Sequence, residues 1–228
     1  LLSFQNYIRA FRTFLGKEKG MRQYKLKAPE KNYKVFVDSS LKNIRPCTAC
    51  AIIKNLKLDN EKIKNLVDLQ EKLHATIGRK RRKAAIGIYP MEKITFPITF
   101  TAREPDKIKF VPLESTVEMT GLEILRKHPT GKDYSNLLAG KAKFPIFIDA
   151  KKEILSMPPI INSQTTGRIT ETTKDIFVEC SGSNQEVLEK CLNIIVTSLI
   201  EMGGAVYPME VEYGKFKKII TPNLTPEK

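Results

Sequence analysis

A carboxyl group and a hydroxyl group are spaced to lie side by side near residue 180. The apolar run at 175–181 predicts a β-strand, along which side chains alternate between two faces. Phe177, Glu179 and Ser181 therefore share one face, and the apolar residues between them form the other. A carboxylate beside a hydroxyl can bind a polar ligand through hydrogen bonds. A solvated strand face is the alternative interpretation.

A second pair of candidate residues follows from the geometry of a hairpin. Residues 150–153 join two short apolar runs, and a loop of this length is typical of a hairpin connection. If Asp149 pairs with Ile154, Phe147 lies opposite Ser156 on the same face of the sheet. An aromatic ring and a hydroxyl group would then be neighbours.

A stiff segment with few backbone donors follows that hairpin. Pro158 and Pro159 fix two φ angles and remove two backbone N–H groups. They precede a cluster of small polar side chains that includes Asn162 and Ser163. This combination predicts a rigid pocket for a polar ligand. An ordinary proline-rich edge turn is the alternative.

The chain is strongly basic, which favours a polyanionic partner. Its 228 residues include 39 Lys and Arg against 25 Asp and Glu, a formal net charge of +14. Such a charge is typical of nucleic-acid binding, although general surface basicity would give the same count. An acidic membrane is disfavoured because the basic residues form no amphipathic face. No run approaches the roughly 18 apolar residues that span a bilayer.

The densest basic run separates a predicted helix from a predicted strand. It consists of Arg79, Lys80, Arg81 and Arg82. Contact with nucleic-acid phosphates is one interpretation, and a solvated loop is the other. Arg168 could add to such a surface.

The cysteines and histidines predict neither a metal site nor a nucleophilic triad. Cys47 and Cys50 have CxxC spacing, but positions three apart in a strand face opposite sides. No second ligand pair accompanies them. His74 and His128 are the only histidines, and the sequence identifies no partner that would make either a general base. We therefore predict no catalytic side chain and no metal in this chain.

The hydrophobic patterns predict an α+β fold. The expected helices are 2–15, 59–77, 120–127 and 183–202, and the expected strands are 33–37, 47–53, 84–89, 96–101, 144–149, 154–157, 175–181 and 205–213. Capping boxes are expected at Thr120–Glu123 and at Ser183–Glu186. Because helices and strands do not alternate regularly, we expect mixed, largely antiparallel sheets with a few packed helices.

Seven short motifs follow one another along nearly the whole chain. They lie at residues 43–46, 69–73, 78–82, 85–88, 109–113, 155–182 and 221–226. In this order they resemble the editing region of the phenylalanine–tRNA ligase beta subunit, in its archaeal and eukaryotic form. Each motif alone is weakly specific, and their common order is strongly specific.

The resemblance implies a task for the candidate residues. In this family, a synthetic site that accepts phenylalanine sometimes charges tyrosine, and the editing site hydrolyses the tyrosyl ester of tRNA(Phe). Positions matching Phe147, Ser156, Glu179 and Ser181 line the family's editing pocket. We expect Glu179 to accept a hydrogen bond from the tyrosine hydroxyl, and Phe147 to pack against the ring. Ser156 and Ser181 would contact the substrate or the terminal ribose.

Asn162 and Gly182 complete the predicted substrate-binding set, and the basic run with Arg168 is expected to contact tRNA phosphates. Two residues depart from the archaeal pattern, in which Asp often replaces Glu179 and Thr usually replaces Ser181. These departures alter the reach and volume of the side chains and leave the class of site unchanged.

The resemblance also implies the surroundings of this chain. Residues 1–24 would be a remnant of a preceding N-terminal domain plus linker, 25–220 the editing domain, and 221–228 the start of the next linker. The expected partners are tRNA(Phe) and a catalytic alpha subunit in a cytoplasmic alpha2beta2 tetramer. ATP and magnesium belong to the alpha subunit's synthetic site, so no cofactor is expected here. A non-catalytic tRNA-binding or subunit-interface module and a free-standing RNA-binding protein are the alternatives.

Overall fold

The computed structural model describes residues 3–20, 22–214 and 217–225 of the chain. Its helices are α1 Phe4–Phe14, α2 Asn60–Ala75, α3 Gly121–Lys127, α4 Pro129–Tyr134 and α5 Gln185–Glu201. Its strands are β1 Lys34–Val37, β2 Cys47–Lys54, β3 Ala84–Pro90, β4 Ile98–Arg103, β5 Lys109–Phe110, β6 Met119–Thr120, β7 Phe144–Ile148, β8 Ile154–Met157, β9 Ile161–Asn162, β10 Ile176–Gly182, β11 Ala205–Tyr213 and β12 Lys217–Thr221. Residue 2, where the first helix was expected to begin, and residues 226–228 of the expected linker lie outside the described residues.

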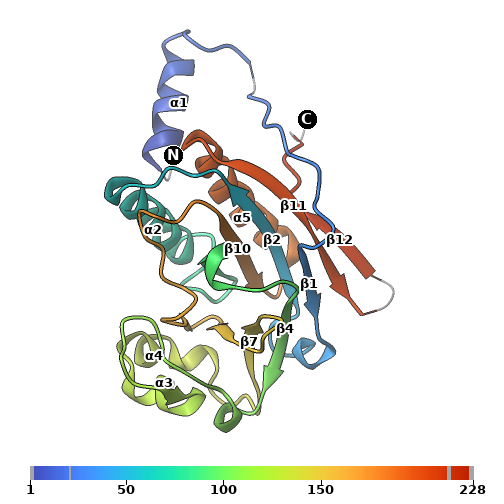
Figure 1. The fold of residues 1–228 in the computed structure, drawn as a ribbon. Helices are drawn as coiled ribbons and strands as arrows, with labels where there is room; N and C mark the ends of the chain where they lie inside the picture. Colours follow the sequence, from blue (N-terminus) through green and yellow to red (C-terminus); the bar gives the residue numbers. More distant parts are fainter. Residues whose placement is uncertain (1–2, 21, 215–216, 226–228) are drawn as a thin grey trace.

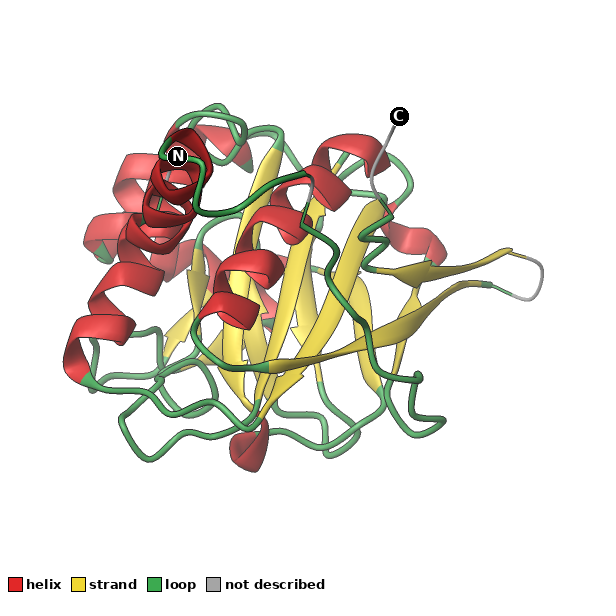
Figure 2. Ribbon diagram, turned by 90° about the horizontal axis from the view of Figure 1, so that it is seen from above, coloured by secondary structure: helices red, strands yellow, loops and turns green. Residues whose placement is uncertain are grey.

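One large mixed sheet organises the molecule, which confirms the α+β prediction. The strand order is β3-β10-β2-β11-β1-β4-β7-β8-β9, with β12 paired to β11. Only the contacts of β1 with β11 and with β4 are parallel among these described pairs. Figure 1 shows α5 behind β2 and β10, and α3 with α4 at the end of the molecule near β7. Figure 2 shows the strands from above, with the β11–β12 hairpin extending outward at the side.

The two ends of this sheet curl back and meet. The hydroxyl of Tyr89, on the first strand β3, lies 2.8 Å from the Ser156 Oγ on β8. Strand twist accumulates across many strands, so a long sheet can bend until its first and last strands come together. We call this junction between β3 and β8–β9 the seam.

The hairpin that was expected to set the site has the predicted pair but an irregular register. Phe147 pairs with Ser156, as predicted, but a bulge follows and Ile148 pairs with Ile154. The expected pairing of Asp149 with Ile154 is therefore wrong. Asp149 leaves the ladder because its carboxylate accepts three backbone N–H groups; the donors are Thr95, Lys151 and Glu153.

The two faces of β10 are both buried, in different surroundings. Val178 and its apolar neighbours pack with α2 and α5, as expected for core. Glu179 is 2% exposed and Ser181 is 0% exposed. The interpretation of this polar face as a solvated surface is therefore wrong, because the curled sheet covers it.

Most element boundaries follow the sequence, with three informative differences. The capping box at Thr120 and Glu123 is confirmed. The second box is wrong, because Asn184 caps α5 alone by accepting the Val187 N–H at 3.0 Å. The sequence also missed α4, which follows α3 directly, and the edge strand β12.

Polar contacts attach α1 to the rest of the molecule. Ser3 lies 3.3 Å from the Ser198 hydroxyl of α5, and the Asn6 side chain donates to that hydroxyl at 3.0 Å. The aromatic side chains of α1 are exposed instead, with Phe14 the most exposed at 84%. The helix itself was predicted correctly from the spacing of these residues, although their side chains do not form a buried apolar face in this structure.

The cysteines have structural roles. Cys47 packs against the helical side of the sheet and Cys50 against the opposite side, as three-residue spacing in a strand predicts. All four cysteines are free thiols. Within the described ranges, no three His, Cys, Asp or Glu residues are grouped to hold a metal ion. No helix in the same ranges is long and apolar enough to cross a membrane.

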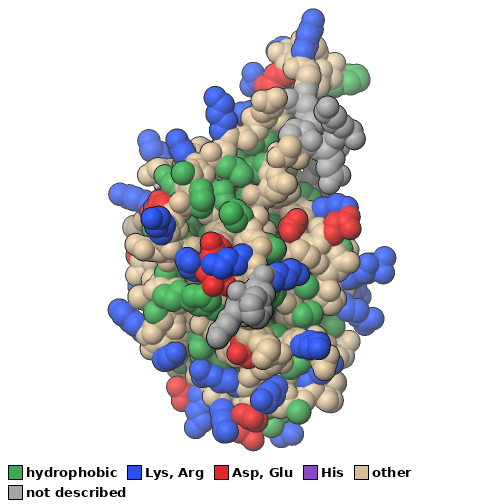
Figure 3. Space-filling view, turned by 90° about the vertical axis from the view of Figure 1, so that its right-hand side faces the viewer, with side chains coloured by type: hydrophobic (Ala, Val, Ile, Leu, Met, Phe, Trp, Pro, Cys, Tyr) green, Lys and Arg blue, Asp and Glu red, His purple; other side chains and the backbone are tan. Residues whose placement is uncertain are grey.

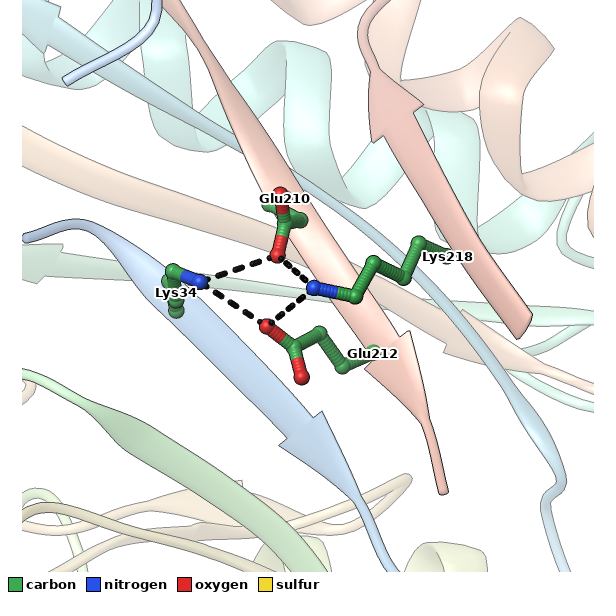
Figure 4. Close-up of polar contacts among 4 residues, drawn as sticks. All are labelled: Lys34, Glu210, Glu212 and Lys218. Atoms are coloured by element: carbon green, nitrogen blue, oxygen red, sulfur yellow. Dashed lines mark hydrogen bonds and ion pairs between the residues drawn. The ribbon is translucent and has the colours of Figure 1, made fainter. Parts of the chain in front are cut away.

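Charged side chains are distributed over the surface. Figure 3 shows Lys and Arg spread over the face it draws, without a single dominant patch. Lys34, Glu210, Glu212 and Lys218 form a surface ion-pair cluster on β1, β11 and β12, in which each ammonium contacts both carboxylates at 3.0 to 3.2 Å (Figure 4).

Candidate functional site

A cavity of about 510 Å³ lies beside the seam. Its walls are α2, the free edge of β3 and the segment from Ser156 to Ile169. Pro158 and Pro159 are buried and form part of the wall. The double proline therefore belongs to a pocket and not to an exposed edge turn.

Three predicted substrate-binding residues line the cavity together. They are Ser156 from β8, Asn162 from β9 and Glu179 from β10. The first two come from the last strands of the sheet, while β10 lies next to its first strand. Only closure of the seam brings them into one site.

Phe147, predicted to form a wall, lies in the adjacent core and not on the cavity surface. It is fully buried and stacks on Phe100, with the ring centroids 4.1 Å apart and the planes at 2°. Its pairing with Ser156 places it behind the wall, where it supports the strand.

Ser181 and Gly182 also lie outside the residues that line the cavity. The Ser181 hydroxyl accepts a hydrogen bond from Arg45 Nε at 3.0 Å, and the Ser181 carbonyl accepts one from Arg45 Nη2. Gly182 is required for packing, since a Cβ there would lie 2.1 Å from the Lys83 carbonyl oxygen. Both residues shape β10 without facing the cavity.

Glu179 is the most unusual group in the site. One carboxyl oxygen lies 3.2 Å from the Tyr89 hydroxyl, while the other, Oε2, is buried without a hydrogen-bond partner. Burial raises the Glu179 pKa to about 8, although the charge of Arg45 and the neighbouring hydroxyl groups of Tyr89 and Ser181 act in the opposite direction. A buried polar atom without a partner is rare in folded proteins, and here it belongs to a side chain that lines the cavity.

Arg45 is a buried cation that sequence analysis did not single out. It is 6% exposed, and burial lowers its pKa to about 10. Its side chain also donates to the Arg81 carbonyl at 3.4 Å, in addition to Ser181. Arg45 therefore ties the end of β10 to the basic loop and places a positive charge near Glu179.

Tyr89 is a second residue that sequence analysis missed. Its side chain is fully buried, and its hydroxyl lies between Ser156 and Glu179 and 3.4 Å from Asn162 Oδ1. Gly87 leaves room for this hydroxyl, since a Cβ there would lie 2.2 Å from it. In the sequence, this arrangement is indicated only by the run Gly87-Ile-Tyr89, in which a small residue stands two positions before a large one.

His74 lines the cavity but has a structural role. Its Nε2 accepts the Ile86 N–H at 2.9 Å, so Nδ1 carries the hydrogen and donates to Glu71 at 3.1 Å. Gln70 donates to the Ile86 carbonyl at 2.7 Å, so these two α2 side chains cover the free edge of β3 at that residue. Burial lowers the His74 pKa, which favours this neutral form. Its acceptor nitrogen is engaged and cannot act as a base without breaking this bond.

Arg81, predicted to contact phosphate, turns inward. Its Nη1 donates to the Ile160 carbonyl at 2.8 Å, and Nη2 pairs with Glu71 at 3.1 Å. The guanidinium also lies 4.3 Å from the centroid of the Tyr134 ring. Arg81 thus connects α2, α4 and the segment after β8 across the seam.

The rest of the basic loop faces solvent. Arg79, Lys80 and Arg82 are exposed, and the first two share positive φ angles with Arg81, at 48°, 53° and 63°. These left-handed conformations are uncommon outside glycine and turn Arg81 away from its neighbours. Arg168 is exposed at the rim of the cavity.

The cavity can bind a polar ligand, but the residues that the structure describes assemble no nucleophilic triad there. Ser156 has a phenol as its close partner, and His74 is engaged with the backbone. His128 contacts the Leu113 carbonyl at 3.1 Å and does not line the cavity. The chemistry that the site supports is hydrogen bonding to a ligand hydroxyl by buried groups.

Comparisons with known proteins give a consistent result. Residues 32–194 match the family model of the B3/4 domain. The chain is 43% identical to the phenylalanine–tRNA ligase beta subunits of Thermococcus sibiricus and of Pyrococcus furiosus, in each case over 227 residues. These matches cover 100% of this chain and 40% of each relative, so the chain spans about 40% of their length.

A solved structure shares the fold. It is an N-terminal fragment of the phenylalanyl-tRNA synthetase beta subunit from Pyrococcus horikoshii, 42% identical with a TM-score of 0.93. The match covers 99% of this chain and 64% of that one.

Proposed function

The chain belongs to the B3/4 domain family, in the form shared with archaeal phenylalanine–tRNA ligase beta subunits, and we propose that its cavity is an editing site for tyrosyl-tRNA(Phe). The observation that carries this proposal is the Glu179 carboxyl, which is buried at the cavity with one oxygen unpartnered. The hydroxyl group of a tyrosyl ester could supply the hydrogen-bond partner that this carboxyl oxygen lacks.

Discrimination between tyrosine and phenylalanine then follows from desolvation. A phenylalanyl ester would leave Glu179 Oε2 buried and unpaired, whereas a tyrosyl ester would supply its partner. Sites built to hydrogen-bond a substrate hydroxyl reject the analogue without it by roughly 10⁴- to 10⁵-fold in favourable cases. Asn162 and Ser156 provide further polar groups on the same wall.

The hydrolysis itself requires little from side chains. An aminoacyl ester is already activated, so a water molecule held in a fixed position beside oriented donors can cleave it. We propose no metal or cofactor for this chain. ATP and magnesium would act at the synthetic site of the alpha subunit.

The exposed part of the basic loop supports tRNA binding. Arg79, Lys80 and Arg82 lie next to Arg81, which lines the cavity, and Arg168 lies at its rim. Phosphates near the acceptor end would meet these charges while the terminal ester enters the site. Arg81 is excluded from the phosphate-contact set, because its guanidinium is occupied by internal contacts.

The remaining parts of the proposal concern the larger protein. The alpha subunit is the proposed partner, in a cytoplasmic alpha2beta2 assembly. Residues 25–220 are proposed as the editing domain, between the end of an N-terminal domain and a following linker. The alternative, a non-catalytic tRNA-binding or interface module, shares these partners and differs only in activity.

Hydrolysis of mischarged tRNA tests the proposal directly. We expect the chain to hydrolyse tyrosyl-tRNA(Phe) much faster than phenylalanyl-tRNA(Phe), and Glu179→Ala to abolish the difference. Glu186→Ala is a matched control, because Glu186 is exposed on α5, outside the cavity, and pairs with Lys190 on the same helix. Absence of hydrolysis in this chain and in the complete ligase would overturn the editing proposal and favour the non-catalytic module.

A further inference from the structure

Tyr89 touches every predicted substrate-binding residue that lines the cavity. Its hydroxyl oxygen is 2.8 Å from Ser156 Oγ and 3.2 Å from Glu179 Oε1. Asn162 Oδ1 lies 3.4 Å away on the third side. These partners come from three different strands, so one phenol oxygen connects both sides of the seam.

The ring that carries this hydroxyl is rigidly held. It is fully buried and stacks on Phe177, with centroids 5.7 Å apart and an interplanar angle of 26°. A tyrosine has two main side-chain torsions, so burial and stacking of the ring fix the position of its oxygen.

We propose that Tyr89 is a positioning and specificity-determining residue of the cavity, which holds Glu179 Oε1 and the Ser156 hydroxyl so that Glu179 Oε2 is the oxygen presented to a ligand hydroxyl. This inference rests on the proposed editing function for its substrate, a hydroxylated aromatic amino-acid ester. It assigns a role to a residue of β3 that does not itself line the cavity.

The packing around Gly87 supports this assignment. A Cβ at Gly87 would lie 2.2 Å from the Tyr89 hydroxyl and 2.5 Å from Glu179 Oε1. Both polar atoms therefore occupy the space that any larger side chain would fill. The phenol and the carboxyl fit side by side only over a glycine.

The single phenolic hydrogen links Tyr89 to the charge state of Glu179. When the carboxylate is ionised, Tyr89 donates to it and can accept the hydrogen of Ser156. When the carboxyl is protonated, Tyr89 is free to donate to Ser156, and Glu179 can itself donate. The hydrogen-bond direction at Ser156 and at the ligand therefore changes with one proton.

Charged and titratable groups on other elements influence the pKa of Glu179. Arg45 is the nearby cation, and hydrogen bonding by Tyr89 lowers the Glu179 pKa in the same direction. The buried Cys50 thiol lies opposite Glu179 in the β2–β10 ladder, and burial raises its pKa. The Cys180 thiol lies on the other face of β10. Removal of the phenolic hydroxyl should therefore move the Glu179 pKa upward from about 8.

The test is Tyr89→Phe, which keeps the stacked ring and removes only the hydroxyl. Tyr207→Phe is the matched control, because this phenol lies on β11 beside Lys54 and outside the cavity. The first measurement is ¹³C NMR of the Glu δ-carboxyl, assigned with Glu179→Gln and titrated without tRNA. We expect the Glu179 titration to move to higher pH in Tyr89→Phe and to stay unchanged in Tyr207→Phe.

The second measurement is the ratio of kcat/KM for tyrosyl over phenylalanyl ester. We expect Tyr89→Phe to lower this ratio by about tenfold, the effect of one lost hydrogen bond. In the Glu179→Gln background, Tyr89→Phe should lower the ratio no further, because Tyr89 acts through that carboxyl.

Two results would overturn the assignment. They are an unchanged Glu179 titration in folded Tyr89→Phe, or an equal loss of selectivity with and without Glu179. If neither the unaltered chain nor the complete ligase hydrolyses either ester, the editing proposal fails, and the titration still decides whether Tyr89 holds the carboxyl.

Discussion

Glutamate side chains have opposite surroundings in the surface ion-pair cluster of β1, β11 and β12 and in the buried cavity wall. At the surface, Glu210 and Glu212 each meet both Lys34 and Lys218, so two negative charges face two positive ones (Figure 4). In the cavity, Glu179 has a phenol on one oxygen and no partner on the other.

The two sites therefore differ in what an unpaired glutamate costs the folded protein. A solvated cluster can form and break at little cost, because water replaces each contact. A buried carboxyl with an unpaired oxygen destabilises the folded protein unless it is protonated or bound. Such a group points to function.

Removal of the cation near the cavity should be the most damaging change. Arg45→Met keeps the length of the side chain but loses its hydrogen bonds to the Ser181 hydroxyl and carbonyl. We expect a loss of roughly 3–5 kcal/mol in the free energy of unfolding, as when one partner of a buried charged network is removed. Urea unfolding measures it, and a loss below that of a typical surface substitution would contradict the buried role of Arg45.

The stability of the protein should fall with pH because of Glu179. Its pKa is about 8 in the folded protein and 4.5 ordinarily, so the folded state keeps a proton that the unfolded chain has released between these values. The stabilisation is complete below pH 4.5 and is lost as the pH rises to about 8, at roughly 1.4 kcal/mol per pH unit.

Urea unfolding at several pH values should show this slope in the unaltered chain and not in Glu179→Gln. Lys218→Met is the surface counterpart. Contacts with Glu210 and Glu212 raise the Lys218 pKa above its usual 10.5, so its titration lies above this range. A slope that persists in Glu179→Gln would assign the effect to another group.

The exposed basic loop should govern the salt dependence of tRNA binding. Replacing Arg79, Lys80 and Arg82 together with Gln should reduce the slope of log K against log salt by about 2 to 3, if each contacts one phosphate. Lys34→Gln with Lys218→Gln is a matched control that removes cations already paired with carboxylates. Equal slopes for both variants would mean that the loop does not contact the tRNA.

The smallest effect is expected at the surface cluster. Lys218→Met should shift Tm by no more than about 2 °C, and 1 M NaCl should erase that shift. Differential scanning calorimetry at two salt concentrations measures it. A large, salt-independent shift would show that the cluster stabilises the fold as strongly as the buried network does.

Local sequence patterns predicted most of the elements and part of the site. Strands 154–157 and 205–213 have the predicted bounds, and Thr120 caps α3 as expected. Such features depend on alternation, spacing and capping within a few residues. The same local pattern placed Glu179 and Ser181 on one face of β10, which is correct.

Other features depend on contacts that no local pattern contains. The bulge after Phe147 arises because Asp149 binds the Thr95 N–H from another loop. Three consecutive left-handed residues turn Arg81 inward, although its sequence resembles a solvated basic loop. The sequence could not separate Arg81 from its neighbours because the partners that hold it lie on α2, α4 and the segment after β8.

The sequence by itself determined the α+β class, the bounds of several strands and the residue types that can hydrogen-bond a ligand. Closure of the seam decided the rest. It buries Glu179, whose strand face the sequence alone allowed to be solvated, in the wall of a cavity. It also places the Tyr89 hydroxyl within hydrogen-bond distance of Ser156. Strand alternation is a local property of the chain, whereas the curl that joins β3 to β8 is a sum of twists over the whole sheet. Only the tertiary structure fixes that sum.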